Sequence, residues 1–129
     1  MHMRNFSRDA RIWVPPIAMM ALIFALSAMP SGSEDHGVLY VIVRKLAHVS
    51  EYALLLALWW RALDTRVSDW RALAFALGIV ILYAIADEWH QTFVNGRTGR
   101  PLDVGIDLVG ALGATALIAR RRPRRRAAA

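Results

Sequence analysis

Four apolar segments, each long enough to cross a bilayer as a helix, account for most of this chain. They cover residues 12–29, 38–60, 72–93 and 102–119. A helix rises 1.5 Å per residue and a bilayer's hydrocarbon core is about 30 Å thick, so about 20 apolar residues suffice for one crossing. Pro15 and Pro16 fall near the start of the first segment, where a helix tolerates proline. The sequence therefore predicts an all-α, polytopic membrane four-helix bundle.

The overall composition agrees with a bilayer as the solvent of this chain. Hydrophobic residues make up 57% of the 129 residues, and the mean hydropathy is +0.35. A soluble domain of this size buries too little of its surface to hide so much apolar area, and a disordered chain would be more polar. The alternative for the first segment is a cleaved signal peptide, with Arg4, Arg8 and Arg11 as its basic region. Three further apolar segments favour an uncleaved span.

The chain divides into three parts. Residues 1–11 form a cytoplasmic N-terminal segment, residues 12–119 a four-transmembrane-helix domain, and residues 120–129 an Arg-rich cytoplasmic tail. Turn-like stretches occur at 30–33, 64–69 and 95–101, between the apolar segments. The chain has no cysteine, which excludes disulfide bonds, a thiolate nucleophile and a cysteine-based metal site.

The distribution of basic residues predicts the orientation. With four spans, both termini and the loop between the second and third segments share one side. Twelve of the 16 Lys and Arg residues lie on that side, six of them in the tail, and the other side has Arg44, Lys45, Arg97 and Arg100. Cytoplasmic loops carry the excess of Lys and Arg, so we expect both termini in the cytoplasm (N-in/C-in). The side with both termini also has four aromatic residues of an interfacial belt: Trp13, Trp59, Trp60 and Trp70.

The net charge of +6 equals the charge of the six tail arginines, so the rest of the chain is neutral. A nucleic-acid-binding protein would need a basic face as well as a basic tail, and we predict no nucleic-acid partner. The tail is best explained as a topology anchor that contacts anionic membrane lipids.

Polar residues from three segments converge on the non-cytoplasmic leaflet. They are His48, Asp87, Glu88, His90, Gln91, Arg97, Arg100, Asp103 and Asp107. Ionisable groups at membrane depth are costly and normally face a bundle interior or a wet cavity. Helical spacing places Lys45, His48 and Tyr52 on one face. On the last segment the polar face also carries Gly110 and Ala114, a small-residue pair that lets another helix approach closely. The sequence thus predicts a polar pocket in the outer leaflet.

Two stretches of this polar set resemble a known family. They are Arg-Lys-Leu-Ala-His-Val-Ser-Glu-Tyr at 44–52, and Asp-Glu-Trp-His-Gln-Thr-Phe at 87–93 followed by Gly96, Arg97, Asp103, Asp107 and Gly110. With a weaker Leu-Ser-Ala-Met-Pro at 26–30, they resemble the VanZ-like family over roughly residues 22–114. Asn95 stands where the family pattern has proline, and the Arg tail lies outside the match.

The resemblance implies a four-helix protein of the bacterial cytoplasmic (inner) membrane. One member of that family is linked to resistance against teicoplanin, a glycopeptide antibiotic that binds cell-wall precursors, so the resemblance implies a possible link of the same kind here. It does not imply a settled reaction, a cofactor or an oligomeric state, so roles for the polar residues are argued from their chemistry.

The candidate residues fall into two groups. Histidine titrates near neutral pH and a carboxylate can orient it or act as a base, which gives a catalytic set of His48, Asp87, Glu88, His90 and Asp103. Arginine and lysine hold phosphate or carboxylate, which gives a substrate-binding set of Lys45, Tyr52, Gln91, Arg97, Arg100 and Asp107. The alternative is that these charges neutralise one another and the histidines link helices. The His, Asp and Glu residues are also chemically suited to a metal, but no fixed metal-binding spacing occurs.

Three functions remain open from the sequence. The first is an enzyme that acts on an anionic phospholipid or a lipid-linked precursor in the membrane. The second is a non-catalytic binding or accessory protein that uses the same residues as a rigid pocket. The third is a small proton-coupled transporter, which the nearly uncharged inner halves of the four segments disfavour.

Overall fold

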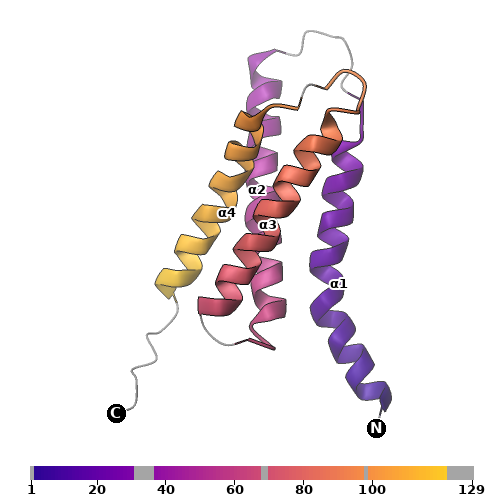
Figure 1. Ribbon diagram of the computed structural model, residues 1–129, viewed down its shortest axis with the longest axis vertical. Helices are drawn as coiled ribbons and strands as arrows, with labels where there is room; N and C mark the ends of the chain where they lie inside the picture. The colour runs from indigo at the N-terminus through magenta and orange to yellow at the C-terminus, as the bar shows by residue number, and fades with distance from the viewer. Residues whose placement is uncertain (1, 31–36, 68–69, 98, 122–129) are drawn as a thin grey trace.

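The computed structural model shows four long helices that alternate in direction along the chain (Figure 1). They are α1 (His2–Ser27), α2 (Val38–Leu63), α3 (Trp70–Gln91) and α4 (Pro101–Arg121). The structure describes residues 2–30, 37–67, 70–97 and 99–121, with side chains from Phe6 onward, and none of these residues forms a strand. The predicted all-α fold is confirmed. Residues 31–36, 68–69 and 122–129, which include part of the first predicted turn, Glu34, Asp35, Asp69 and most of the tail arginines, lie outside the described residues.

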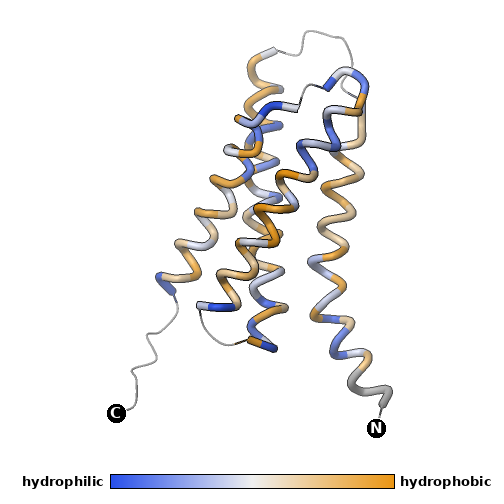
Figure 2. Tube along the Cα trace, in the orientation of Figure 1, coloured by the Kyte–Doolittle hydropathy of each residue, from blue (hydrophilic) through white to orange (hydrophobic). Residues whose placement is uncertain are grey.

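The start of α1 and the end of α4 lie at the same end of the bundle, here named the termini end (Figure 1). The opposite end, where α3 finishes and α2 and α4 begin, is named the distal end. Figure 2 shows that α3 and α4 are mostly apolar along their middle and hydrophilic toward both ends, whereas α2 begins with an apolar run at the distal end. Trp13 and Trp59 meet near the termini end with their ring centroids 6.3 Å apart.

Three of the helices are long and apolar enough to cross a membrane: Phe6–Ser27 within α1, Trp70–Gln91 and Pro101–Arg121. The chain is therefore a multi-pass membrane protein. The prediction of four such segments differs from this at α2, whose first half carries Arg44, Lys45 and Glu51. α2 is also the central helix, because it packs against α1, α3 and α4, whereas α1 and α4 do not meet among the described residues. A central helix can carry charges that its neighbours shield from lipid.

Small side chains allow the helices to pack closely around α2. On α3, Ala72, Ala76, Val80 and Ala84 recur every four residues and are fully buried. On α4, a Cβ atom at Gly110 would overlap the carbonyl oxygen of Val49 in α2 and lie 2.8 Å from its carbonyl carbon. Small residues at such positions let two helix backbones approach without displaced side chains. The small-residue face predicted on α4 thus lies against α2.

The first helix starts earlier than the predicted apolar segment 12–29. α1 begins at His2, which places Pro15 and Pro16 inside the helix and not near its first turn. Proline has no N–H, so Pro15 leaves the carbonyl oxygen of Arg11, four residues earlier, without its helical donor. Arg61 of α2 donates to that oxygen at 3.1 Å. A neighbouring side chain thus replaces the missing helical hydrogen bond, which is how membrane helices tolerate proline.

Candidate functional site

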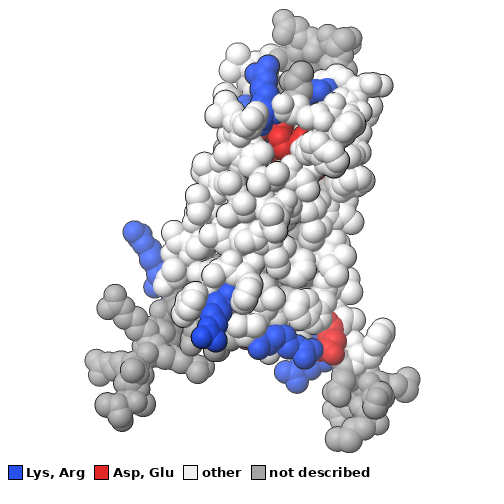
Figure 3. Space-filling view, viewed as in Figure 1, with Lys and Arg blue, Asp and Glu red and all other residues white. Residues whose placement is uncertain are grey.

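A pocket of about 420 Å³ lies at the distal end among α2, α3, α4 and the loop that joins α3 to α4. Its charged lining consists of four basic residues, Arg44, Lys45, Arg97 and Arg100, and three acidic ones, Glu88, Asp103 and Asp107. Figure 3 shows acidic side chains flanked by basic ones at this end. On the face shown, a broad uncharged band separates them from the basic side chains of the termini end. Seven of the nine polar residues that the sequence predicted to converge line this pocket.

Helix geometry explains which residues reach the pocket. Tyr40, Arg44 and His48 lie four residues apart on α2, and all three line the pocket. Residues spaced by three or four share one face of a helix. On α4, Asp103 and Asp107 are related in the same way and line the opposite wall. The pocket is thus bounded by the polar stripes of two facing helices.

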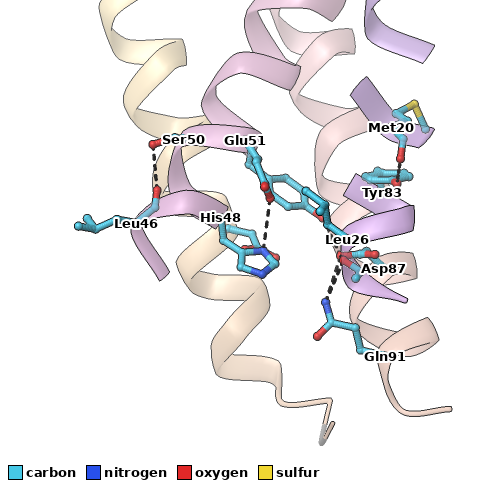
Figure 4. Close-up of polar contacts among 12 residues, drawn as sticks. Met20, Leu26, Leu46, His48, Ser50, Glu51, Tyr83, Asp87 and Gln91 are labelled. Carbon is cyan, nitrogen blue, oxygen red and sulfur yellow. Dashed lines mark hydrogen bonds and ion pairs between the residues drawn. The ribbon is translucent and has the colours of Figure 1, made fainter. Parts of the chain in front are cut away.

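His48 is held between two carboxylates. Its Nδ1 atom lies 3.4 Å from Oδ1 of Asp107 and 3.9 Å from Oε2 of Glu51, and neither contact meets hydrogen-bond geometry. Figure 4 shows the side chains of His48 and Glu51 facing each other. Asp107 is only 3% exposed. A buried carboxylate beside one ring nitrogen orients the imidazole and leaves the other nitrogen, Nε2, to exchange a proton.

The other two acidic residues of the pocket also have partners. Nζ of Lys45 donates to Oδ1 of Asp103 at 3.1 Å. The backbone N–H of Arg100 donates to Oε1 of Glu88 at 2.5 Å, immediately before α4 begins at Pro101. Carboxylates are favourable near a helix N-terminus because the helix dipole is positive there. Each carboxylate of the pocket therefore already has a partner within this chain. Among the charged residues that line the pocket, the basic ones outnumber the acidic ones.

Asp87 lies outside the pocket, in a buried polar network. Its Oδ2 atom accepts hydrogen bonds from Oγ of Ser27 at 2.8 Å, from the hydroxyl of Tyr52 at 3.4 Å and from Nε2 of Gln91 at 3.2 Å. The Gln91 amide also donates to Oγ of Ser27 at 3.3 Å. Figure 4 shows Gln91 pointing toward Asp87. The network joins α1, α2 and α3, and only Gln91 among its members lines the pocket.

His90 also turns away from the pocket. Its ring stacks on Phe24 of α1, with the ring centroids 4.3 Å apart and the planes inclined by 25°. Of the predicted catalytic set, His48, Glu88 and Asp103 thus line the pocket, while Asp87 and His90 face α1. The predicted substrate-binding residues line the pocket with one exception, Tyr52, which is fully buried.

Arg97 lines the pocket and also fastens the end of α1. Its Nε atom donates to the carbonyl oxygen of Met29 at 3.1 Å, and its Nη2 atom donates to that of Leu26 at 3.3 Å. Leu26 lies in the last turn of α1 and Met29 two residues beyond its end, where a cation is favourable to the helix dipole. Burial, and after it the nearby charge of Arg44, lower the pKa of Arg97. Arg97 therefore links the α3–α4 loop to α1 at the edge of the pocket.

Three residues of this region were absent from the predicted set. Tyr40 and Arg44 line the pocket, and their spacing of four from His48 is a signal that the sequence does contain. Ser27 gave no such signal, because its partner Asp87 is 60 residues away. Among the described residues, no three His, Asp or Glu side chains are grouped closely enough to hold a metal ion.

The chain was compared with known proteins. A family model described as VanZ/LLP1 matches residues 5–121. Searches of curated proteins and of solved structures gave no match. The matched region contains the pocket, the buried network around Asp87 and nearly all of the four helices. With a match over most of its length, the chain belongs to the VanZ/LLP1 family.

Proposed function

We propose that this membrane protein binds the anionic head group of an envelope lipid, a phospholipid or a lipid-linked cell-wall precursor, in the distal pocket. The observation that supports this most is the excess of basic residues in the pocket, where four Lys and Arg side chains accompany three carboxylates. Two of those carboxylates already contact Lys45 or His48, and the third accepts the Arg100 backbone N–H. An anionic ligand would therefore meet a net positive site, and arginine pairs with phosphate through two hydrogen bonds.

The orientation that we propose is N-in/C-in, with α2 as a fourth span of the bacterial cytoplasmic membrane. The start of α1 and the end of α4 share one end of the bundle (Figure 1). Twelve of the 16 Lys and Arg residues would then be cytoplasmic, as the positive-inside rule requires. The distal pocket would open at the outer leaflet, where envelope precursors and outer-leaflet phospholipids present their head groups.

The proposal extends to catalysis, in which His48 would act as a general base on the bound lipid. The contact between Asp107 and Nδ1 of His48 is the observation that favours it. A histidine oriented by a carboxylate can take a proton through Nε2 from a water or hydroxyl group that attacks the bound ligand, and can return it to a leaving group. Arg44 and Arg100 would hold the charge of the ligand. The alternative is a binding or accessory role, in which the same residues recognise the head group without turnover.

Replacing both Arg44 and Arg100 with glutamine should weaken phosphatidylglycerol binding by about tenfold or more. Charged hydrogen bonds contribute about 1.5–3 kcal/mol each, and 1.4 kcal/mol is tenfold in affinity. The measurement is native mass spectrometry of protein released from nanodiscs that contain equal amounts of phosphatidylglycerol and phosphatidylcholine. The control is Arg71→Gln with Arg120→Gln, which removes the same charge near the termini end. Equal loss in both double variants would contradict head-group binding in the pocket.

For turnover, we expect His48→Ala combined with Glu88→Gln to abolish a change that the wild-type protein produces in the membrane lipids. The measurement is lipid-resolved mass spectrometry of cells with both proteins at matched abundance, together with their teicoplanin susceptibility. A lipid or lipid-linked precursor that changes only with the intact pocket would identify the substrate class. An unchanged lipid profile with stably folded protein would contradict catalysis and leave the binding role, and unchanged susceptibility would remove the link to glycopeptide resistance.

A further inference from the structure

A second groove, of about 300 Å³, lies between α1 and α2 beside the polar pocket. Four residues line both spaces: Tyr40, Arg44, His48 and Arg97. The groove and the pocket are therefore adjacent, with these side chains between them. The basic pair Arg44 and Arg97 stands at the boundary between them.

The rest of the groove wall is mainly apolar and open to the outside of the bundle. Its apolar residues are Leu26, Met29, Pro30, Val43 and Ala47. Leu26 is 41% exposed, Met29 58% and Val43 56%. Because the chain is a multi-pass membrane protein, these exposed flanks would contact the hydrocarbon chains of the bilayer.

We propose that the groove between α1 and α2 is the acyl-chain site of the lipid whose head group occupies the pocket. This inference rests on the proposed function, and it names the ligand as a phospholipid taken from the membrane and not a water-soluble phosphate. Arg44, which lines both spaces, and Arg100 of the pocket hold the phosphate, beside Arg97 on the boundary. One acyl chain lies along Val43 and Ala47 of α2, against Leu26 of α1.

Charge and solvation both support a lipid as the occupant. A lipid whose head group enters a pocket inside the bundle must keep its tail in an apolar medium, which requires an apolar opening toward the bilayer beside that pocket. The groove is such an opening, because five of the six residues that line it alone are apolar. Arg44 and Arg97 lie on its boundary with the pocket, and its further acidic residue, Glu51, lies 3.9 Å from Nδ1 of His48.

The groove gives the lipid access to the pocket and adds little to its binding affinity. Lipid tails are as apolar as leucine, so a chain that moves from bilayer to groove gains little from the hydrophobic effect. The ionic contacts of the head group would supply the attraction, and the groove would let the head group reach them. Filling the groove should consequently block lipids and spare small soluble phosphates.

The test is Ala47→Trp, which adds bulk at an exposed position of the groove wall. Ala86→Trp is the matched control, because Ala86 is exposed on α3 toward the distal end and lines neither space. The probes are dioleoyl phosphatidylglycerol in nanodiscs, measured by native mass spectrometry, and glycerol 1-phosphate in solution, measured by calorimetry. We expect Ala47→Trp to reduce lipid retention at least fivefold, to keep glycerol phosphate affinity within twofold, and Ala86→Trp to change neither.

Two other outcomes separate the two proposals. If Ala47→Trp retains the lipid as well as wild type while Arg44→Gln with Arg100→Gln loses it, the acyl-chain site is overturned and head-group binding stands. If the wild-type protein retains no phosphatidylglycerol in preference to phosphatidylcholine and binds no glycerol phosphate, the head-group proposal is overturned, and the acyl-chain site with it.

Discussion

Replacing Gly110 with alanine should destabilise the protein by about 3 kcal/mol or more, because the new methyl group would overlap the backbone of α2. The Cβ atom would meet the carbonyl oxygen of Val49 and lie 2.8 Å from its carbonyl carbon. A backbone carbonyl cannot rotate aside as a flexible side chain can, so α2 and α4 would have to separate. Overpacking of a close contact typically costs about 1–3 kcal/mol, and a clash with backbone lies at or above the upper end. Unfolding in mixed micelles, followed by tryptophan fluorescence, measures the change.

Gly113 supplies the control for this experiment. It lies on the same helix, and a Cβ atom there would meet nothing within 4 Å. Gly113→Ala should therefore change the free energy of unfolding by less than about 0.5 kcal/mol, as is usual for exposed positions. If the two variants are equally stable, α4 does not approach α2 as closely as the structure shows. The same approach aligns Asp107 with His48, so Gly110→Ala should also reduce phosphatidylglycerol retention.

Removal of the Asp87 carboxylate should produce the second large effect. Asp87→Leu would take the acceptor from three buried donors on Ser27, Tyr52 and Gln91. An unsatisfied buried donor costs about 1–3 kcal/mol, whereas hydrogen bonds measured within membrane proteins average about 0.6 kcal/mol. For three linked bonds we expect a loss of about 2–4 kcal/mol in the free energy of unfolding, measured in the same mixed micelles.

Asp87→Asn is the matched variant, because it keeps an acceptor oxygen and nearly the same shape. We expect it to lose less than about 1 kcal/mol, since an acceptor for the three hydrogen bonds remains. A leucine variant as stable as wild type would show that the network does not hold the bundle together. If a stable asparagine variant does not produce the lipid change proposed for the wild-type protein, Asp87 would instead be part of the chemistry, as its place in the predicted catalytic set requires.

The attachment of α1 shows why this network matters. α1 packs mainly on α2, has a smaller contact with α3 and has none with α4 among the described residues. Several of its ties to α3 and the α3–α4 loop are polar. Ser27 bonds to Asp87, the hydroxyl of Tyr83 donates to the carbonyl oxygen of Met20, and Arg97 donates to Leu26 and Met29. Polar ties hold a helix in register because each bond has one geometry, whereas apolar contacts tolerate sliding.

Sequence patterns predicted the helices more closely than the site. The predicted segment 38–60 became α2 (Val38–Leu63), and 102–119 became α4 (Pro101–Arg121), each with ends within three residues. The large difference was at α1, which begins at His2 and contains Pro15, with Arg61 as the donor to the carbonyl oxygen that Pro15 leaves free. That donor is 50 residues away, so no local pattern could indicate it. The N-in/C-in orientation stays a prediction.

The sequence also predicted only in part which candidate residues reach the pocket. His48 and Asp107 were expected on one leaflet, and they lie 3.4 Å apart. Asp87 and Glu88 are adjacent in sequence, yet Glu88 lines the pocket and Asp87 joins the buried network toward α1. Neighbouring residues on a helix point about 100° apart. Which of the two faces the pocket depends on how α3 is rotated, and the sequence pattern of α3, apolar on nearly all sides, does not specify that rotation.

Hydropathy and helical period were enough to predict the class of this protein, the number of its helices, the approximate limits of all of them but the first, and the end of the bundle at which the pocket residues lie. These properties follow from hydropathy and helical period, which are local, and from the alternation of direction that short connections impose. The tertiary structure decided which polar residues line the pocket, which ones fasten α1, and that a groove lies beside the pocket between α1 and α2. The reason is that these assignments depend on helix rotation. Rotation is fixed by contacts such as Gly110 against Val49, between residues far apart in the chain.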